Sequence, residues 1–219
     1  MVVFFFGCEK YGKNINVKVD SISVHHNETV SIDAKSNTPI NYTSMDEYHA
    51  TVDGDGNVTG KYVGTTKIKL DNGNDARFVN VNVIPRYNIY NEPDISFGES
   101  KQSIISKFGQ PDSTWLDMGT TYYYNITNNG ISLRLIVDFN GYSESSTVTA
   151  YGIDGFDRSL YDQLALFLDE RYCETNTDFG HLYYNGLSNE TSTMRVKLIP
   201  YGTVYNPPLS CKITYNKNQ

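Results

Sequence analysis

Three cysteines and four histidines are the residues of this 219-residue sequence best suited to nucleophilic catalysis or metal binding. Thiol and imidazole groups do this chemistry in pairs or larger sets that lie close together. His25 and His26 are adjacent, so on a strand they would point to opposite faces. Cys173 and His181 are close enough in sequence to form a thiol–imidazole pair, but Cys173 is expected at the end of an amphipathic helix. The spacing therefore favours neither a metal centre nor a catalytic dyad.

Other catalytic motifs are also missing. The sequence has no His-x-x-x-His or Cys-x-x-Cys pair, no phosphate-binding loop and no dinucleotide-binding glycine pattern. The segment 141–145 lacks the second glycine of a nucleophile elbow. The segment 53–56, Asp-Gly-Asp-Gly, has two close carboxylates but lacks the further ligands of a calcium loop, so a hairpin turn explains it better. We therefore predict a non-enzymatic protein without a cofactor or a metal.

Cys8 is the cysteine with the most informative neighbours. It follows a short apolar run, Val2–Phe6, and Gly7, and it precedes a polar stretch. This pattern resembles a bacterial lipobox, which would make Cys8 the lipidated residue and residues 1–14 a signal remnant and tether. The usual basic region and longer apolar region are missing, so the true start is expected upstream of Met1. The alternative is a first strand with a buried thiol.

The lipobox reading implies export to the bacterial cell envelope, with a lipid anchor in the outer membrane. In an oxidising compartment Cys173 and Cys211 could form a disulfide. Two separately buried thiols are the alternative, because pairing needs a Cα separation of roughly 4.4–6.8 Å that a sequence cannot show.

The net charge of −7 argues against a nucleic-acid partner, because phosphate binding needs clustered Lys and Arg. The apolar fraction of 39% is that of a globular chain, and its length allows two domains.

Residues 15–85 alternate apolar and polar side chains in short segments separated by Gly-, Asn- and Asp-rich turns. About seven strands without a helical period are typical of a β-sandwich. The order and residues of four segments resemble the bacterial Ig-like group 2 family: Ala50–Asp53, Gly56–Gly60, Gly64–Ile68 and Val79–Val83. Tyr42 stands where that family usually has Trp. The resemblance implies an immunoglobulin-like sandwich that acts as a spacer or adhesion element and has no catalytic residues.

Residues 86–93 are expected to link this module to a second domain at 94–219, which we predict to be α+β. Ser100 can cap a short helix that ends at Gly109, and a second helix begins near Asp157. Three strands are predicted after each helix, at 122–126, 131–138 and 147–153, then at 182–185, 194–200 and 210–215. Both helices are expected on one face of an antiparallel sheet. The two helix-plus-three-strand segments could be copies that arose by duplication, or similar by convergence. The entry from Phe97 to Pro111 resembles β-lactamase-inhibitor-like and small outer-membrane lipoprotein repeats.

Tyrosines concentrate in this second domain, which holds 14 of the 18. Exposed tyrosine provides contact area for proteins and for sugar rings. We predict a candidate binding face made of Tyr122, Tyr124, Tyr183, Tyr184 and Trp115. The alternative is that the tyrosines cover a half-buried sheet. Two functions follow: an Ig-like stalk that presents a protein-binding domain, or a surface glycan-binding protein that uses the tyrosine face.

Overall fold

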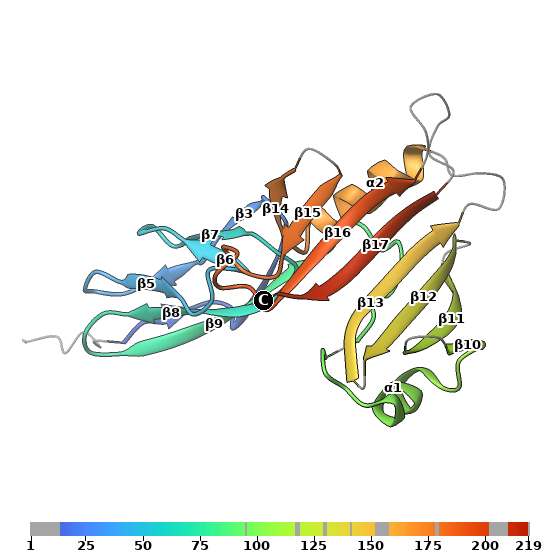
Figure 1. Ribbon diagram of the computed structural model, residues 1–219. Coiled ribbons are helices and arrows are strands. Elements are labelled where there is room, and N and C mark those ends of the chain that lie inside the picture. Colours follow the sequence, from blue (N-terminus) through green and yellow to red (C-terminus); the bar gives the residue numbers. More distant parts are fainter. Residues whose placement is uncertain are drawn as a thin grey trace, which may run out of the picture. The chain divides into compact units, whose positions relative to one another are not determined.

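The computed structural model describes residues 14–94, 96–116, 119–128, 131–140, 142–151, 158–177, 180–201 and 210–218. The chain divides into two compact units with the boundary between Ile84 and Pro85 (Figure 1). The predictions for residues 1–13, including Cys8, lie outside the described residues. Each unit is described by itself.

The N-terminal unit is all β. A four-stranded sheet has the order β2-β9-β8-β5, a three-stranded sheet has the order β3-β7-β6, and β1 pairs with β4. The strands are β1 (Asn16–Val17), β2 (Ser21–His25), β3 (Thr29–Ser31), β4 (Ala34–Lys35), β5 (Asn41–Ser44), β6 (Ala50–Val52), β7 (Asn57–Gly60), β8 (Gly64–Asp71) and β9 (Ala76–Ile84).

The alternating pattern of the sequence fixes the core of this unit. In β9, Val79, Val81 and Val83 are buried, whereas the residues between them are exposed. Side chains alternate between the two faces of a strand, so the inner face of β9 is apolar from Val79 to Val83. These valines pack with Val58 of β7 and Ile68 of β8, which are also fully buried. The result is the sandwich that the periodicity predicts.

Tyr42 takes part in the same unit through a close contact with a turn. Gly56 has φ +81°, a left-handed conformation, and a Cβ atom there would lie 2.8 Å from Cζ of Tyr42. Only glycine satisfies both the backbone angle and the space that this ring leaves.

The C-terminal unit is mostly β with two short helices. Its elements are α1 (Lys101–Phe108), β10 (Ser113–Leu116), β11 (Thr120–Asn128), β12 (Ile131–Asn140), β13 (Tyr142–Tyr151), α2 (Arg158–Asp169), β14 (Cys173–Asn176), β15 (His181–Tyr184), β16 (Met194–Tyr201) and β17 (Ser210–Lys217).

All eight strands form one antiparallel sheet in the order β10-β11-β12-β13-β17-β16-β15-β14. Each half is a helix followed by four neighbouring strands, and the halves join through β13 and β17 (Figure 1). Each half thus has one strand more than the sequence pattern predicts. The additional strands are β10 and β14, the two edges of the sheet. Both are four residues long, too short to show a clear alternation.

One face of this sheet carries the core. Ile104 of α1 and Leu164, Phe167 and Leu168 of α2 are fully buried in one cluster with strand residues such as Leu135. Both helices therefore cover the same face, as the sequence predicts. Ile89 and Tyr90 join that cluster, so the segment expected to be a linker is packed into the C-terminal unit.

Helix α1 has the caps that its sequence predicts. Ser100 accepts a hydrogen bond from the N–H of Ser103 (3.2 Å), and the N–H of Gly109 donates to the carbonyl of Ile105 (2.8 Å). Glu99 adds a further anchor, because its carboxylate accepts from Lys107 Nζ (2.6 Å) and from the N–H of Ser96 (2.7 Å). Burial alone would raise the pKa of Glu99, but these donors together with Ser103 Oγ lower it to about 2.

This shift predicts acid sensitivity of the α1 region. Because the pKa of Glu99 is lower in the folded state than its usual value of 4.5, its carboxylate stabilises the fold above pH 4.5. That contribution is lost as the pH falls toward 2. The thermal midpoints of wild type and Glu99→Gln should differ most above pH 5 and converge near pH 2. A difference that stays constant over this range would contradict the assignment.

Candidate binding surface

The tyrosines of the predicted binding face lie on two different faces of the sheet, which corrects the prediction. Tyr183 is 0% and Tyr124 5% exposed, and both belong to the core cluster under the helices. Tyr122 packs against the same cluster, with its ring centroid 5.0 Å from that of Phe139. The ring of Phe108 in α1 covers Tyr124 at 5.7 Å. Tyr124 and Tyr183 are core residues and Tyr122 is a partly buried residue at the margin of the core, because the helices cover the face that carries all three.

The opposite face, called the open face below, holds Trp115 and Tyr184. Trp115 is paired with Thr121, and Tyr184 with Arg195, so each lies on the face opposite to Tyr122 and Tyr183. No helix of the described ranges packs against this face, and its described side chains are all exposed or half-buried. They are Ser113, Trp115, Thr121, Tyr123, Asn125, Arg134, Ile136, Asp138, Cys173, Thr175, Leu182, Tyr184, Arg195, Lys197, Ile199, Lys212, Thr214 and Asn216.

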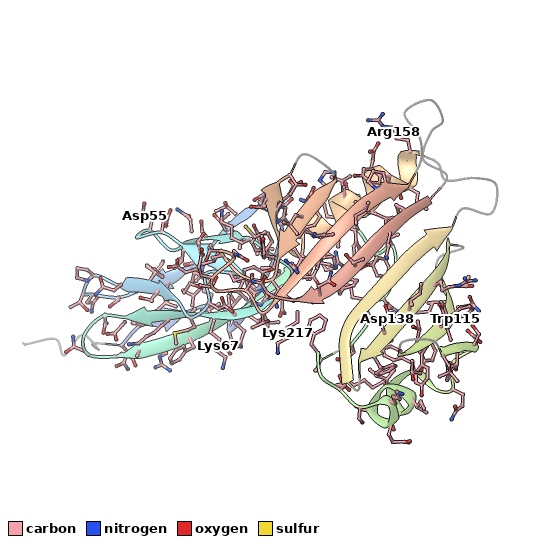
Figure 2. The ribbon with its side chains drawn as sticks, viewed as in Figure 1. Asp55, Lys67, Trp115, Asp138, Arg158 and Lys217 are labelled. Atoms are coloured by element: carbon pink, nitrogen blue, oxygen red, sulfur yellow. The ribbon has the colours of Figure 1, made fainter. Side chains whose placement is uncertain are left out.

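Among the described residues of the C-terminal unit, the β10 edge carries the most exposed large apolar side chains. Trp115 is 62% and Leu116 77% exposed (labelled Trp115 in Figure 2). The two are adjacent in a strand, so they point to opposite faces of the sheet. β10 pairs with β11 on one side and is the last strand of the sheet on the other. An edge strand leaves alternate backbone N–H and C=O groups unpaired, and β10 contains no charged residue to protect them.

The predicted disulfide is absent, and the alternative of separate thiols is what the structure shows. Cys173 and Cys211 are both free. Cys173 begins β14 and Cys211 is in β17, so three strand spacings of about 4.8 Å separate their strands. Cys173 was expected at the end of a helix, but α2 ends earlier, at Asp169.

The two thiols should differ in reactivity. Cys211 is fully buried, and burial raises the pKa of its thiol to about 12, whereas Cys173 is half-buried. Thiolate is the reactive form, so an alkylating reagent at pH 8 should modify Cys173 in the folded protein and Cys211 only after unfolding. Peptide mass mapping without reductant checks this. Recovery of a Cys173–Cys211 linked peptide would overturn it.

The histidines bond mainly to nearby backbone or carboxylate groups. His25 Nδ1 lies 3.0 Å from the carbonyl of Ile84, and His49 Nδ1 lies 3.0 Å from that of Tyr62. His181 Nδ1 lies 2.5 Å from Glu174 Oε1. Among the residues that the structure describes, no group of three His, Cys, Asp or Glu side chains could hold a metal ion.

In the turn at 53–56, the carboxylate of Asp53 is hydrogen-bonded within the turn itself. Asp53 accepts hydrogen bonds from the N–H groups of Asp55 and Asn57 (2.9 Å each) and from Asn57 Nδ2 (2.8 Å). These contacts agree with the hairpin-turn interpretation.

A buried polar cluster that sequence reasoning missed lies under the sheet. Glu92 accepts from Tyr172 (2.7 Å) and Tyr215 (3.2 Å), and its other oxygen lies 3.3 Å from Arg171 Nε. The hydroxyls of Tyr215 and Tyr90 are in direct contact. Burial raises the pKa of Glu92, of Tyr90 and of Tyr215. The cluster connects segments 80 or more residues apart, so no local pattern could have indicated it.

Glu170 extends this anchoring. It is 3% exposed, and its carboxylate accepts from the N–H of Arg86 (2.9 Å) and of Tyr87 (3.1 Å). The guanidinium of Arg171 lies 3.7 Å from the Phe167 ring centroid and donates to the carbonyl of Tyr87 (3.2 Å). Together these bonds fix the first residues after the unit boundary.

The N-terminal unit has an open polar hollow. Its lining includes Asn16, Lys35, Thr38, Tyr42 and Asp55. Among the residues described as lining it, no His or Cys side chain occurs.

Comparison with known proteins identifies the first unit. Residues 15–77 match the family model of the bacterial Ig-like domain (group 2), which confirms the resemblance found in the sequence. A search of curated proteins found no match. Among solved structures, the chain is similar to "Structure of the S-layer protein SbsC, domains 5-6" at 18% identity and a TM-score of 0.28, over 63% of this chain and 89% of that chain. No helix among the described residues is long and apolar enough to cross a membrane.

Proposed function

We propose that this chain is a non-catalytic cell-envelope lipoprotein whose Ig-like unit is a stalk and whose C-terminal unit binds a protein partner at the β10 edge. The observation that carries the proposal is the exposure of Trp115 (62%) and Leu116 (77%) on a strand with a free edge. The bacterial Ig-like family of residues 15–77 suggests a cell-surface or envelope protein and supports the stalk role.

The β10 edge combines two features of protein interfaces. Tryptophan is enriched among the residues that dominate binding energy. An unpaired strand edge can accept an extended segment of a partner through backbone hydrogen bonds, with adjacent side chains adding specificity. The glycan alternative loses its original support, because Tyr124 and Tyr183 are core residues and Tyr122 packs against that core.

The test is capture of a partner by the lipidated protein from detergent-solubilised cells of its own source. Wild type should retain one partner in stoichiometric amount, and Trp115→Ala/Leu116→Ser should lose it. The matched control is Leu187→Ser, which changes another exposed leucine (57%) of the same unit. Equal capture by wild type and the double variant, or no reproducible partner at all, would overturn the proposal.

The lipid anchor is tested separately at Cys8. The Cys8→Ser variant of the exported protein should move from the membrane fraction to the aqueous fraction and should lose the mass of its acyl groups. Two or more chains are needed for stable attachment, because one chain anchors only weakly. An unchanged membrane fraction would remove the lipoprotein part of the proposal and leave the β10 edge untouched.

A further inference from the structure

The open face has a charge opposite to that of the unit that carries it. Residues 86–219 contain 10 basic and 15 acidic residues. On the open face, however, the described charged side chains are Arg134, Arg195, Lys197, Lys212 and Asp138. Four of these five are cations. We call Arg134, Arg195, Lys197 and Lys212 the cationic strip.

The strand register places the members of the strip close together. Arg195 and Lys197 are two residues apart on β16, which is about 7 Å. Lys197 pairs with Thr214, so Lys212 lies diagonally across from it, at about 7–8 Å. Arg134 is in register with Lys212 across β13, two strand spacings or about 10 Å away.

The acidic residue of this face lies apart from the strip. Asp138 is in register with Arg195 but three strands away, about 14 Å, and it accepts a hydrogen bond from Thr121 (2.7 Å). Within the described part of the chain, none of the ion pairs involves Arg195, Lys197 or Lys212. Arg195 Nε is buried and has no hydrogen-bond partner among these residues. Because this nitrogen is buried, a ligand on the surface would meet the outer part of the guanidinium and not Nε.

The neighbours of the strip fit a sugar polymer better than an acidic protein. Thr214 and Asn216 lie between β16 and β13 on the same face, and Tyr184 lies beside Arg195. Hydroxyl and amide groups can bond to sugar hydroxyls, and a tyrosine ring offers an apolar surface to a sugar ring. A protein interface instead needs large, well exposed apolar anchors. Leu182 and Ile199, which pair with Lys197 and Lys212, are only half-buried, whereas the strongly exposed Trp115 and Leu116 are at the far edge of the sheet.

We propose that the cationic strip binds an anionic polysaccharide through carboxylate or phosphate groups repeated along its chain. The lysines and arginines neutralise these groups, and Thr214, Asn216 and Tyr184 contact the sugars between them. This site goes beyond the proposed function, because it uses different residues from the β10 edge and another class of ligand.

The experiment measures binding of the full chain to three probes: polygalacturonate for carboxylate, phosphorylated dextran for phosphate, and neutral dextran. Affinity gel electrophoresis should show retardation by one or both charged polymers but not by neutral dextran. Binding should weaken as salt rises, because the contacts are ionic. Lys197→Glu/Lys212→Glu should lower the affinity by about tenfold or more, since it removes two cations and adds two repulsive charges.

The control is Arg158→Glu/Lys217→Glu, which changes the net charge equally at two exposed cations of the same unit outside the strip (both labelled in Figure 2). It should bind like wild type, and circular dichroism should show both variants folded. Absence of binding to both charged polymers, or equal loss in the two variants, would overturn the proposal. Equal affinity for poly-glutamate or duplex DNA would also overturn it.

The same variants separate this site from the proposed function. Trp115→Ala/Leu116→Ser should bind the charged polymer like wild type, and Lys197→Glu/Lys212→Glu should still capture the protein partner. If the polymer test fails while capture depends on Trp115 and Leu116, only the polysaccharide site is lost. The opposite pattern removes only the protein-binding function.

Discussion

Replacing Tyr183 by alanine is expected to lower the free energy of unfolding of the C-terminal unit by about 3–5 kcal/mol. Tyr183 is fully buried, and its ring packs in the core between the sheet and α2. Removal of a large aromatic side chain leaves a cavity that the neighbouring core residues fill only in part. The loss is a large fraction of the roughly 5–15 kcal/mol that stabilises a typical domain.

Tyr184 is the matched control, since it is the next residue of the same strand and lies on the open face. Tyr184→Ala should cost about 1 kcal/mol or less. Urea unfolding followed by the fluorescence of Trp115, the sole tryptophan of the sequence, reports on the C-terminal unit. A stable Tyr183→Ala variant that lost ligand binding would instead support the tyrosine face predicted from the sequence.

Glu170→Ala is the second large change, with an expected cost of about 3–5 kcal/mol. The variant leaves the N–H groups of Arg86 and Tyr87 without their carboxylate acceptor inside the protein. It also removes the acidic neighbour of Arg171, whose Nη1 lies 3.8 Å from Glu170 Oε2. Glu170 is buried and the two hydrogen bonds are partly buried, so water can replace the lost acceptor only in part. The segment after the unit boundary should therefore loosen from α2.

Two further variants give this prediction its control. Glu170→Gln keeps one oxygen that can accept from both N–H groups, since both bond to Glu170 Oε2, but it removes the charge, so it should cost less than Glu170→Ala. Glu190→Ala removes an exposed carboxylate of the same unit and should change stability by about 0.5 kcal/mol or less. Hydrogen exchange at the amides of Arg86 and Tyr87 should be faster in Glu170→Ala. Unchanged exchange would show that the carboxylate does not hold this segment.

Local patterns in the sequence were enough for the N-terminal unit and for the helix caps. The alternation of Val79, Val81 and Val83 predicted their burial, and the family match at 15–77 confirmed the Ig-like assignment. Ser100 and Gly109 predicted the ends of α1 because caps depend on residues within one turn. All of these signals depend on residues that are neighbours in the chain, so they can be detected in a single sequence.

The candidate site could not be found in the same way. Alternation showed that Tyr122 and Tyr124 share a face, but the face that α1 and α2 cover depends on how the sheet folds over them. The edge strand β10 was not predicted, because its four residues give too little pattern. The cationic strip needs the register of β12, β13, β17 and β16, which joins residues as far apart as Arg134 and Lys212.

The cysteines and histidines also show the difference between what the sequence predicts and what needs the tertiary structure. Residue types and spacing contained no motif for catalysis or metal binding. They were enough to predict the Ig-like unit and the predominance of strands. Only the tertiary structure decided that Cys173 and Cys211 stay apart, and that Tyr124 and Tyr183 are in the core with Tyr122 packed against it. It also decided that Trp115 and Leu116 are exposed and that the cations of the open face are half-buried. The physical reason is that secondary structure and side-chain alternation follow from neighbours in the chain, whereas burial and pairing follow from neighbours in space.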